Sequence, residues 1–79
     1  MGRFKTGDVV MATAGKEKGS VFVVIEDFRA DQLLIADGRH RKIESPKKKS
    51  AKHLLLLGHL EELVLNNRLI WKSLSPYRG

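Results

Sequence analysis

The chain has 79 residues, no cysteine and a formal net charge of +6. This length allows one domain with a marginal core, and the lack of cysteine excludes disulfides and thiolate zinc sites. The run from Leu54 to Leu57 is too short to cross a membrane, and the stretch MGRFKTGDVV lacks the long apolar segment of a signal peptide. We therefore expect a cytoplasmic protein that does not associate with membranes.

Short apolar runs separated by turn residues predict an all-β fold. The runs are rich in β-branched residues and recur about every ten positions, as in Val21-Phe22-Val23-Val24-Ile25. This spacing is typical of a small barrel or sandwich. The predicted strands lie near residues 8–14, 20–27, 32–36, 39–44 and 53–57.

The segment 15–19 predicts a tight loop between the first two strands. Gly15 and Gly19 flank it, and Lys16 and Lys18 lie inside it. Glycines permit the positive φ angles of a tight loop and let a bulky ligand come close. We expect Gly19 either at positive φ or packed tightly under the loop, with both lysines in solvent.

The pair Asp37-Gly38 predicts a β-hairpin. Both residue types tolerate the positive φ angles of a type I′ turn. Residues 39–44 should therefore form a strand that folds back on 32–36, with Ile43 pointing to the core. Pro46 lacks an N–H group and should end that strand.

The excess positive charge lies in one segment. Residues 38–53 hold seven Lys/Arg against one acid, whereas the segments before and after are close to neutral. Clustered cations of this kind are typical of a nucleic-acid-binding surface, although a solvated basic linker has the same composition. The candidate RNA-binding residues, including the loop lysines, are Lys16, Lys18, Arg39, Arg41, Lys42, Lys47, Lys48, Lys49 and Lys52.

The C-terminal segment differs from the rest of the chain. Apolar positions spaced three and four apart predict a helix near 67–74, with Asn66 or Asn67 as its N-cap and Ser75-Pro76 ending it. Ile70, Trp71 and Leu74 would share one face. This face could complete the core of the barrel or contact a partner; completing the core is the default because a small barrel needs cover.

The chain also resembles the KOW motif of ribosomal proteins and transcription elongation factors. The likeness lies in GDVV, AGKEKG and the apolar strand after Gly19, and it continues through LLIADG and PKKK to Leu54. It is closest to bacterial KOW-domain proteins akin to large-subunit ribosomal proteins of the fourteen-e type. The resemblance covers roughly residues 5–55 and implies an SH3-like barrel that binds structured, ribosomal RNA. We expect the barrel over residues 1–57 and a C-terminal extension with a short helix over 58–79.

The composition favours phosphate and shape recognition over base recognition. The chain has only five aromatic residues, and Phe22 and Trp71 are expected to pack, whereas Phe28 and Tyr77 could be exposed. Arg39 and Arg41 are the best candidates for bidentate contacts, since a guanidinium fits phosphate geometry. A lone histidine such as His40 is expected to be structural.

No enzyme is expected. The adjacent acids Glu26-Asp27 and Glu61-Glu62 lack a partner base, and the three histidines lack the spacing of a metal site. We expect no cofactor and no small-molecule substrate. Two other functions stay open: a protein-interaction module that docks a translation or transcription factor through the barrel and the apolar tail, and a ribosome-associated accessory protein that binds both RNA and protein.

Overall fold

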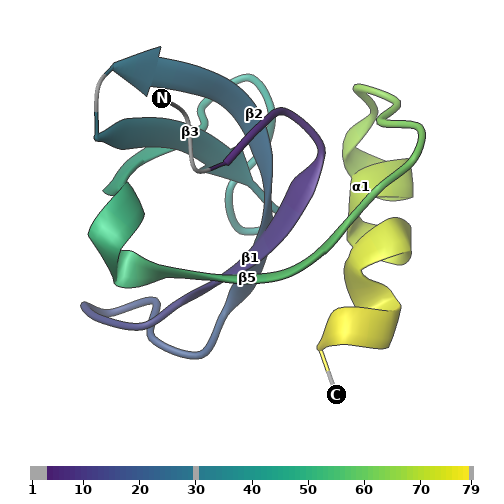
Figure 1. Cartoon of the computed structure of the whole chain (residues 1–79). Helices are drawn as coiled ribbons and strands as arrows, with labels where there is room; N and C mark the ends of the chain where they lie inside the picture. Colours follow the sequence, from purple (N-terminus) through teal and green to yellow (C-terminus); the bar gives the residue numbers. More distant parts are fainter. Residues whose placement is uncertain (1–3, 30, 79) are drawn as a thin grey trace.

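Five antiparallel strands form one strongly curved sheet. The structure, a computed structural model, describes residues 4–29 and 31–78; residues 1–3 and 79, which the expected domain spans include, lie outside the described part, as does residue 30. The strands are β1 (Asp8–Ala12), β2 (Val21–Arg29), β3 (Gln32–Ala36), β4 (Lys47–Ser50) and β5 (Leu54–His59). They lie side by side in the order β4-β3-β2-β1-β5, and the 3₁₀ helix η1 (Ala51–His53) connects the two edge strands β4 and β5 (Figure 1). The expected small all-β barrel with a C-terminal helix is confirmed.

The fourth strand lies later in the sequence than expected. Residues 39–44 form no strand, and β4 instead begins at Lys47, which pairs with Ile35 of β3. The hairpin prediction failed because the Asp37 carboxylate accepts hydrogen bonds from the backbone N–H groups of Arg39 (2.9 Å) and Arg41 (2.8 Å). These bonds close a compact loop, since side-chain capture of nearby backbone groups competes with a sheet ladder. Pro46 accordingly precedes a strand and does not end one.

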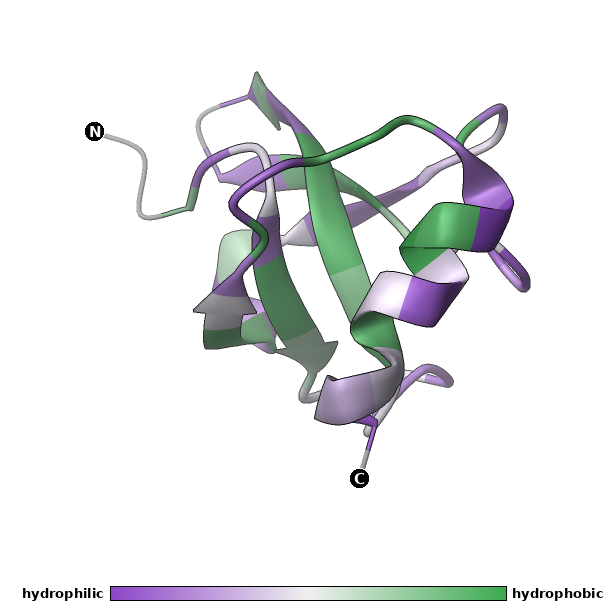
Figure 2. Cartoon of the chain, turned by 90° about the vertical axis from the view of Figure 1, so that its right-hand side faces the viewer, coloured by the Kyte–Doolittle hydropathy of each residue, from purple (hydrophilic) through white to green (hydrophobic). Residues whose placement is uncertain are grey.

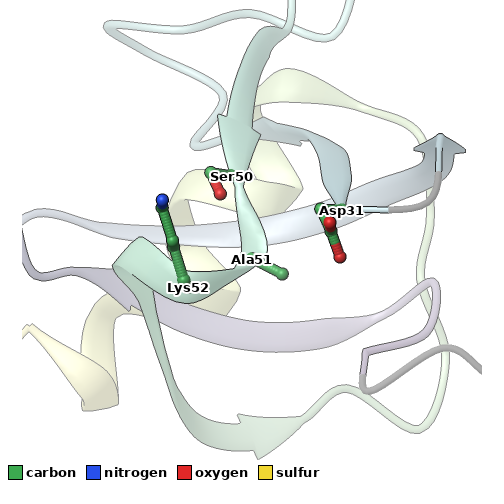
Figure 3. A pocket seen from close by; sticks show the side chains of 4 residues that line it. All are labelled: Asp31, Ser50, Ala51 and Lys52. Carbon is green, nitrogen blue, oxygen red and sulfur yellow. The ribbon is translucent and has the colours of Figure 1, made fainter.

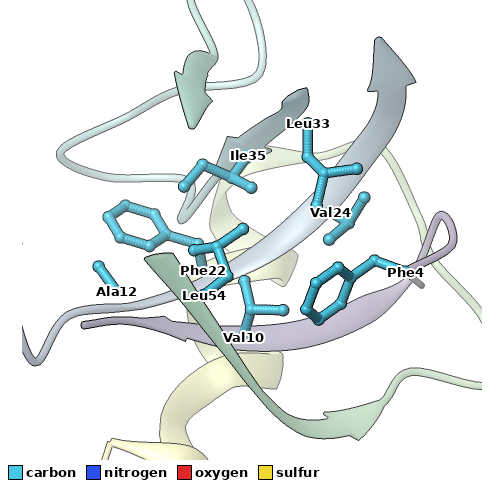
Figure 4. Packing of buried hydrophobic residues seen from close by; sticks show 8 residues of the cluster. All are labelled: Phe4, Val10, Ala12, Phe22, Val24, Leu33, Ile35 and Leu54. Atoms are coloured by element: carbon cyan, nitrogen blue, oxygen red, sulfur yellow. The ribbon is translucent and has the colours of Figure 1, made fainter. Parts of the chain in front are cut away.

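The sheet has apolar side chains on both faces. Alternate residues of β1 and β2 point to opposite sides, so that Val10 enters the barrel while Val9 faces outward. The inner cluster fills the barrel (Figure 4), and its buried members are Phe4, Val10, Ala12, Phe22, Val24, Leu33, Ile35 and Leu54. Double-sided burial explains why Val21 to Ile25 is a continuous apolar run, and Phe22 lies in the core as expected.

The C-terminal helix covers the outer face of the sheet. Helix α1 (Asn67–Leu74) places Ile70 and Leu74 against Val9, Val21 and Val23 in a second, outer cluster. Figure 2 shows the helix lying over hydrophobic strands. The tail therefore completes the fold from outside the barrel.

The ends of helix α1 agree with the prediction. The Asn66 side chain accepts a hydrogen bond from the N–H of Leu69. Helix α1 ends at Leu74, and the 3₁₀ helix η2 (Ser75–Tyr77), which contains Pro76, follows directly. Tyr77 packs against Gly58 of β5, where a Cβ atom would lie 2.7 Å from the tyrosine hydroxyl. Gly58 thus makes room for Tyr77 to anchor the end of the chain.

Two glycines at positive φ occupy opposite environments. Gly19 has a φ of +90°, as expected, and a Cβ atom there would meet nothing within 4 Å. Gly38 has a φ of +85°, but a Cβ atom there would lie 2.1 Å from the carbonyl oxygen of Asn67 in helix α1. Gly19 is required for its backbone conformation alone, whereas Gly38 also allows the loop to touch the helix.

Alanine substitutions at these two glycines form a matched pair. Gly19→Ala should lower the free energy of unfolding by about 1 kcal/mol, the cost of a non-glycine residue at positive φ. Gly38→Ala should cost about 3 kcal/mol or more, because a backbone clash with α1 adds to the same strain. Urea unfolding of both variants measures the difference. Equal losses would contradict the close contact between Gly38 and the helix.

Candidate nucleic-acid interface

An ion-pair cluster ties the β1–β2 loop, residues 13–20, to strand β4. The carboxylate of Glu17 lies 3.3 Å from Nζ of Lys47 and 3.4 Å from Nζ of Lys49. Lys49 also donates a hydrogen bond of 3.0 Å to the carbonyl oxygen of Ala14, and its side chain is only 11% exposed. Lys47 and Lys49 are two residues apart, so both project from the same face of β4 toward the loop.

The lysines of β4 shift the ionisation of Glu17. Partial desolvation raises the pKa of this carboxyl group, but the hydrogen bond from Lys47, a backbone hydrogen bond and the charge of Lys47 lower it further than desolvation raises it. The net result is a pKa below the ordinary value of 4.5. Glu17 is thus ionised at neutral pH and holds the loop against β4.

Other predicted lysines have no such partner. Lys16 and Lys18 are exposed at the loop tip, and the described ranges contain no carboxylate within ion-pair distance of either. Lys48 points to the opposite face of β4, where its ammonium lies 5.2 Å from the centre of the Phe28 ring. Phe28 is 39% exposed and also contacts Arg29. Lys48 therefore lies apart from the Glu17 cluster.

The loop of residues 37–46 is anchored to helix α1. The Asn67 side chain accepts a hydrogen bond from the N–H of Ile43 (2.8 Å) and donates one to the Glu44 carboxylate (2.9 Å). The bond from Asn67 is the main cause that lowers the pKa of Glu44, and the charge of Lys42 adds to it. These contacts hold Arg39 and Arg41 in a loop, not on a strand.

A group of cations surrounds the only tryptophan of the chain. The guanidinium of Arg78 lies 3.6 Å from the centre of the Trp71 ring, and that of Arg39 lies 5.0 Å from it. The His40 ring meets Trp71 edge-on at 5.7 Å. Trp71 belongs to neither apolar cluster, so the expectation that it packs with Ile70 and Leu74 is wrong. The helix turns its ring toward the loop of residues 37–46.

The β1–β2 loop lies between these two groups of cations. Its acidic side chain contacts β4, while Gly19 and Ser20 line a pocket of about 220 Å³ together with Trp71 and Arg78. The loop that carries Lys16 and Lys18 thus contacts Lys47 and Lys49 on one side and lines the pocket of Trp71, next to which Arg39 lies, on the other. Trp71 and His40 were expected to be structural and Arg78 was not predicted, since the three residues approach one another only after the helix packs on the sheet.

Three predicted residues lie at the margin of this arrangement. Arg41 is half-buried, and its backbone carbonyl accepts bonds from Asp37 and Gly38. Lys42 is exposed beside Glu44. Lys52 lines a separate shallow pocket of about 190 Å³ with Asp31, Ser50 and Ala51 (Figure 3).

Arg39 and Arg41 were expected on a strand but lie in a loop, whereas Lys47 to Lys49, expected beyond the end of that strand, form strand β4. Among residues 4–29 and 31–78, no three His, Asp or Glu side chains cluster in a way that could hold a metal ion. None of the described helices is long and apolar enough to cross a membrane. The chain matches no protein-family model and no curated protein.

The pKa of Glu17 gives a direct test of the cluster. Because this pKa is lowered in the folded protein, the ion pairs are present at neutral pH and are lost as the pH falls through the folded-state value, below 4.5. Lys47→Ala should move the pKa back toward 4.5, as measured by NMR titration of the carboxyl carbon. Lys48→Ala is the control with the same charge change. An equal shift in both variants would contradict a specific contact with Lys47.

Proposed function

We propose that the protein is an RNA-binding module of the KOW type that contacts structured, ribosomal RNA in the cytoplasm through phosphate and shape recognition. The observation that carries the proposal is the position of the β1–β2 loop between the lysines of β4 and the arginines around Trp71. The KOW-like motif covers this same loop. A basic surface that extends across several elements suits a polyanion with regularly spaced phosphates.

The balance of paired and unpaired cations favours phosphate binding. Glu17 neutralises part of the charge of Lys47 and Lys49, but Lys16, Lys18, Arg39 and Arg78 have no carboxylate within 4.0 Å in the part of the chain that the structure describes. A solvated cation without an internal partner can meet a phosphate without losing an existing ion pair. The loop tip is therefore where we expect the first phosphate contacts.

A protein-interaction module is the second candidate function. Leu55 and Leu56 of β5 are 49% and 52% exposed, and Leu65 before helix α1 is 60% exposed. Exposed large apolar side chains are typical of surfaces that meet a protein partner. A translation or transcription factor would be the partner, and a ribosome-associated accessory protein could bind RNA and protein on separate faces.

RNA binding through this surface should depend strongly on salt. If about five cations neutralise phosphates, log K should fall with log salt at a slope of about −3.5 to −4.5, and affinity should drop on the order of 100- to 500-fold between 50 and 200 mM salt. Fluorescence anisotropy of a labelled ribosomal RNA hairpin measures the slope. A flat titration would favour the protein-interaction function.

The same assay includes a control matched in charge. Lys16→Ala combined with Lys18→Ala should flatten the slope by about 2. The control, Lys5→Ala combined with Lys72→Ala, removes the same charge away from the β1–β2 loop. Lys5 precedes β1, at the opposite end of that strand from the loop, and Lys72 is exposed on α1. If both double variants flattened the salt slope equally, RNA binding would depend only on net charge, which would contradict a defined binding surface.

Glu17→Gln should strengthen RNA binding. The substitution removes a carboxylate from the surface and frees Lys47 and Lys49, so the salt slope should become steeper by about 1. Glu44→Gln is the control, since Glu44 bonds to Asn67 away from the β4 lysines. An unchanged slope in Glu17→Gln would place Lys47 and Lys49 outside the RNA contact.

A further inference from the structure

Trp71 occupies an unusual place for the only tryptophan of a small protein. Its ring is half-buried, lies outside both apolar clusters and is surrounded by the cationic or titratable side chains of Arg39, His40 and Arg78. Trp71 lines a pocket of about 220 Å³. The other residues of this pocket are Gly19, Ser20, Val21, Asp37, His40 and Arg78.

The chemistry of this pocket suits an aromatic anion. Arg78 lines the pocket, and Arg39 lies next to it with its guanidinium 5.0 Å from the centre of the Trp71 ring. Neither makes an ion pair with any described carboxylate, so their guanidinium groups can bind a phosphate. Asp37, the acid of the pocket, is 3% exposed and directs Oδ1 to two backbone N–H groups of its own loop. The net charge facing a ligand is therefore positive.

The size and rim of the pocket limit the ligand to one flat group. A volume of about 220 Å³ is below the range of pockets that enclose drug-sized ligands, about 300–1,000 Å³. Gly19 forms part of the rim, and the space above its Cα is open to 4 Å. A planar ring can thus approach Trp71 past Gly19, which has no side chain.

We propose that this pocket binds one nucleotide, with its base stacked on Trp71 and its phosphate held by Arg39 and Arg78. The nucleotide can be an unpaired nucleotide of an RNA, in which case the proposal rests on the proposed RNA-binding function. A free nucleotide has the same chemistry and is the other source. The base takes the place of the Arg78 guanidinium on the ring, because a base stacks on an aromatic ring more strongly than an exposed guanidinium does. Arg78, exposed after η2, then turns to the phosphate.

The single tryptophan makes the test direct, because its fluorescence reports only on this pocket. The wild-type chain is titrated with adenosine 5′-monophosphate, ribose 5-phosphate, a single-stranded RNA octamer and a blunt RNA duplex of the same length. The mononucleotide and the single strand should quench Trp71, whereas the sugar phosphate and the duplex, which offer no unstacked base, should not.

Variants separate stacking from charge. Arg78→Lys keeps the charge but loses the planar fork, and Lys72→Ala removes a charge from the same helix outside the pocket. Trp71→Ala should weaken single-strand binding in anisotropy on the order of 5- to 150-fold and leave duplex binding unchanged. Arg78→Lys should show a smaller loss with the same selectivity, and Lys72→Ala should stay near wild type. Circular dichroism checks that each variant is folded; if Trp71→Ala unfolds, Arg78→Lys and the quenching titration decide.

The outcomes distinguish this inference from the proposed function. If RNA binds with a steep salt slope but neither ligand quenches Trp71 and Arg78→Lys binds as wild type, the pocket is overturned while the RNA-binding function stands. If adenosine 5′-monophosphate quenches Trp71 and no RNA binds, the pocket stands as a site for a free nucleotide and the RNA-binding function fails. Equal affinity for ribose 5-phosphate and the mononucleotide would overturn the role of the base.

Discussion

The close contact between Gly38 and helix α1 is the constraint on which the candidate RNA-binding surface depends. A Cβ atom at residue 38 would lie 2.1 Å from the carbonyl oxygen of Asn67 and 3.1 Å from the backbone nitrogen of Trp71. Only glycine allows the loop of residues 37–46 to approach the helix backbone this closely. The Asp37 carboxylate on one side and the Asn67 side chain on the other then fix the loop in place. Without this contact Arg39 and His40 would not meet Trp71.

Glu17 makes the corresponding connection on the other side of the β1–β2 loop. Its ion pairs with Lys47 and Lys49 hold the loop against β4, just as Gly38 holds the 37–46 loop against the helix. The loop thus carries the exposed Lys16 and Lys18 near Arg39 and Arg78, which contact Trp71. Lys16 and Lys18 suit long-range attraction of a polyanion, whereas Arg39 and Arg78 suit a defined local contact.

Local chemistry was enough to predict some elements. The positive φ of Gly19, the Asn66 cap and the end of the helix at Pro76 each follow from the preferences of one or two residues. The β-branched run Val21 to Ile25 likewise fits a strand buried on both faces. These features are decided by neighbours in sequence, so a single sequence contains the information.

The features that sequence could not predict depend on distant contacts. Residues 39–44 have the pattern of a hairpin strand, but Asp37 bonds to their backbone and Gly38 docks on a helix some thirty residues away in the chain. Lysines have low strand propensity, yet Lys47 to Lys49 form a strand because β3 offers a free edge. Trp71 matches the apolar face of the helix by periodicity, but its neighbours Arg39 and His40 come from another element.

The three lysines of β4 have a second physical consequence. In the described part of the chain β4 is the last strand of the sheet on one side, so its outer backbone N–H and C=O groups could accept a strand from another copy. Lys47 and Lys49 are paired with Glu17, but Lys48 is exposed, and its charge on such an edge repels an identical edge and discourages aggregation. Charge that we propose for RNA attraction thereby also opposes pairing of this edge with a second copy. Substituting alanine for all three lysines would remove this repulsion and leave an edge prone to self-association.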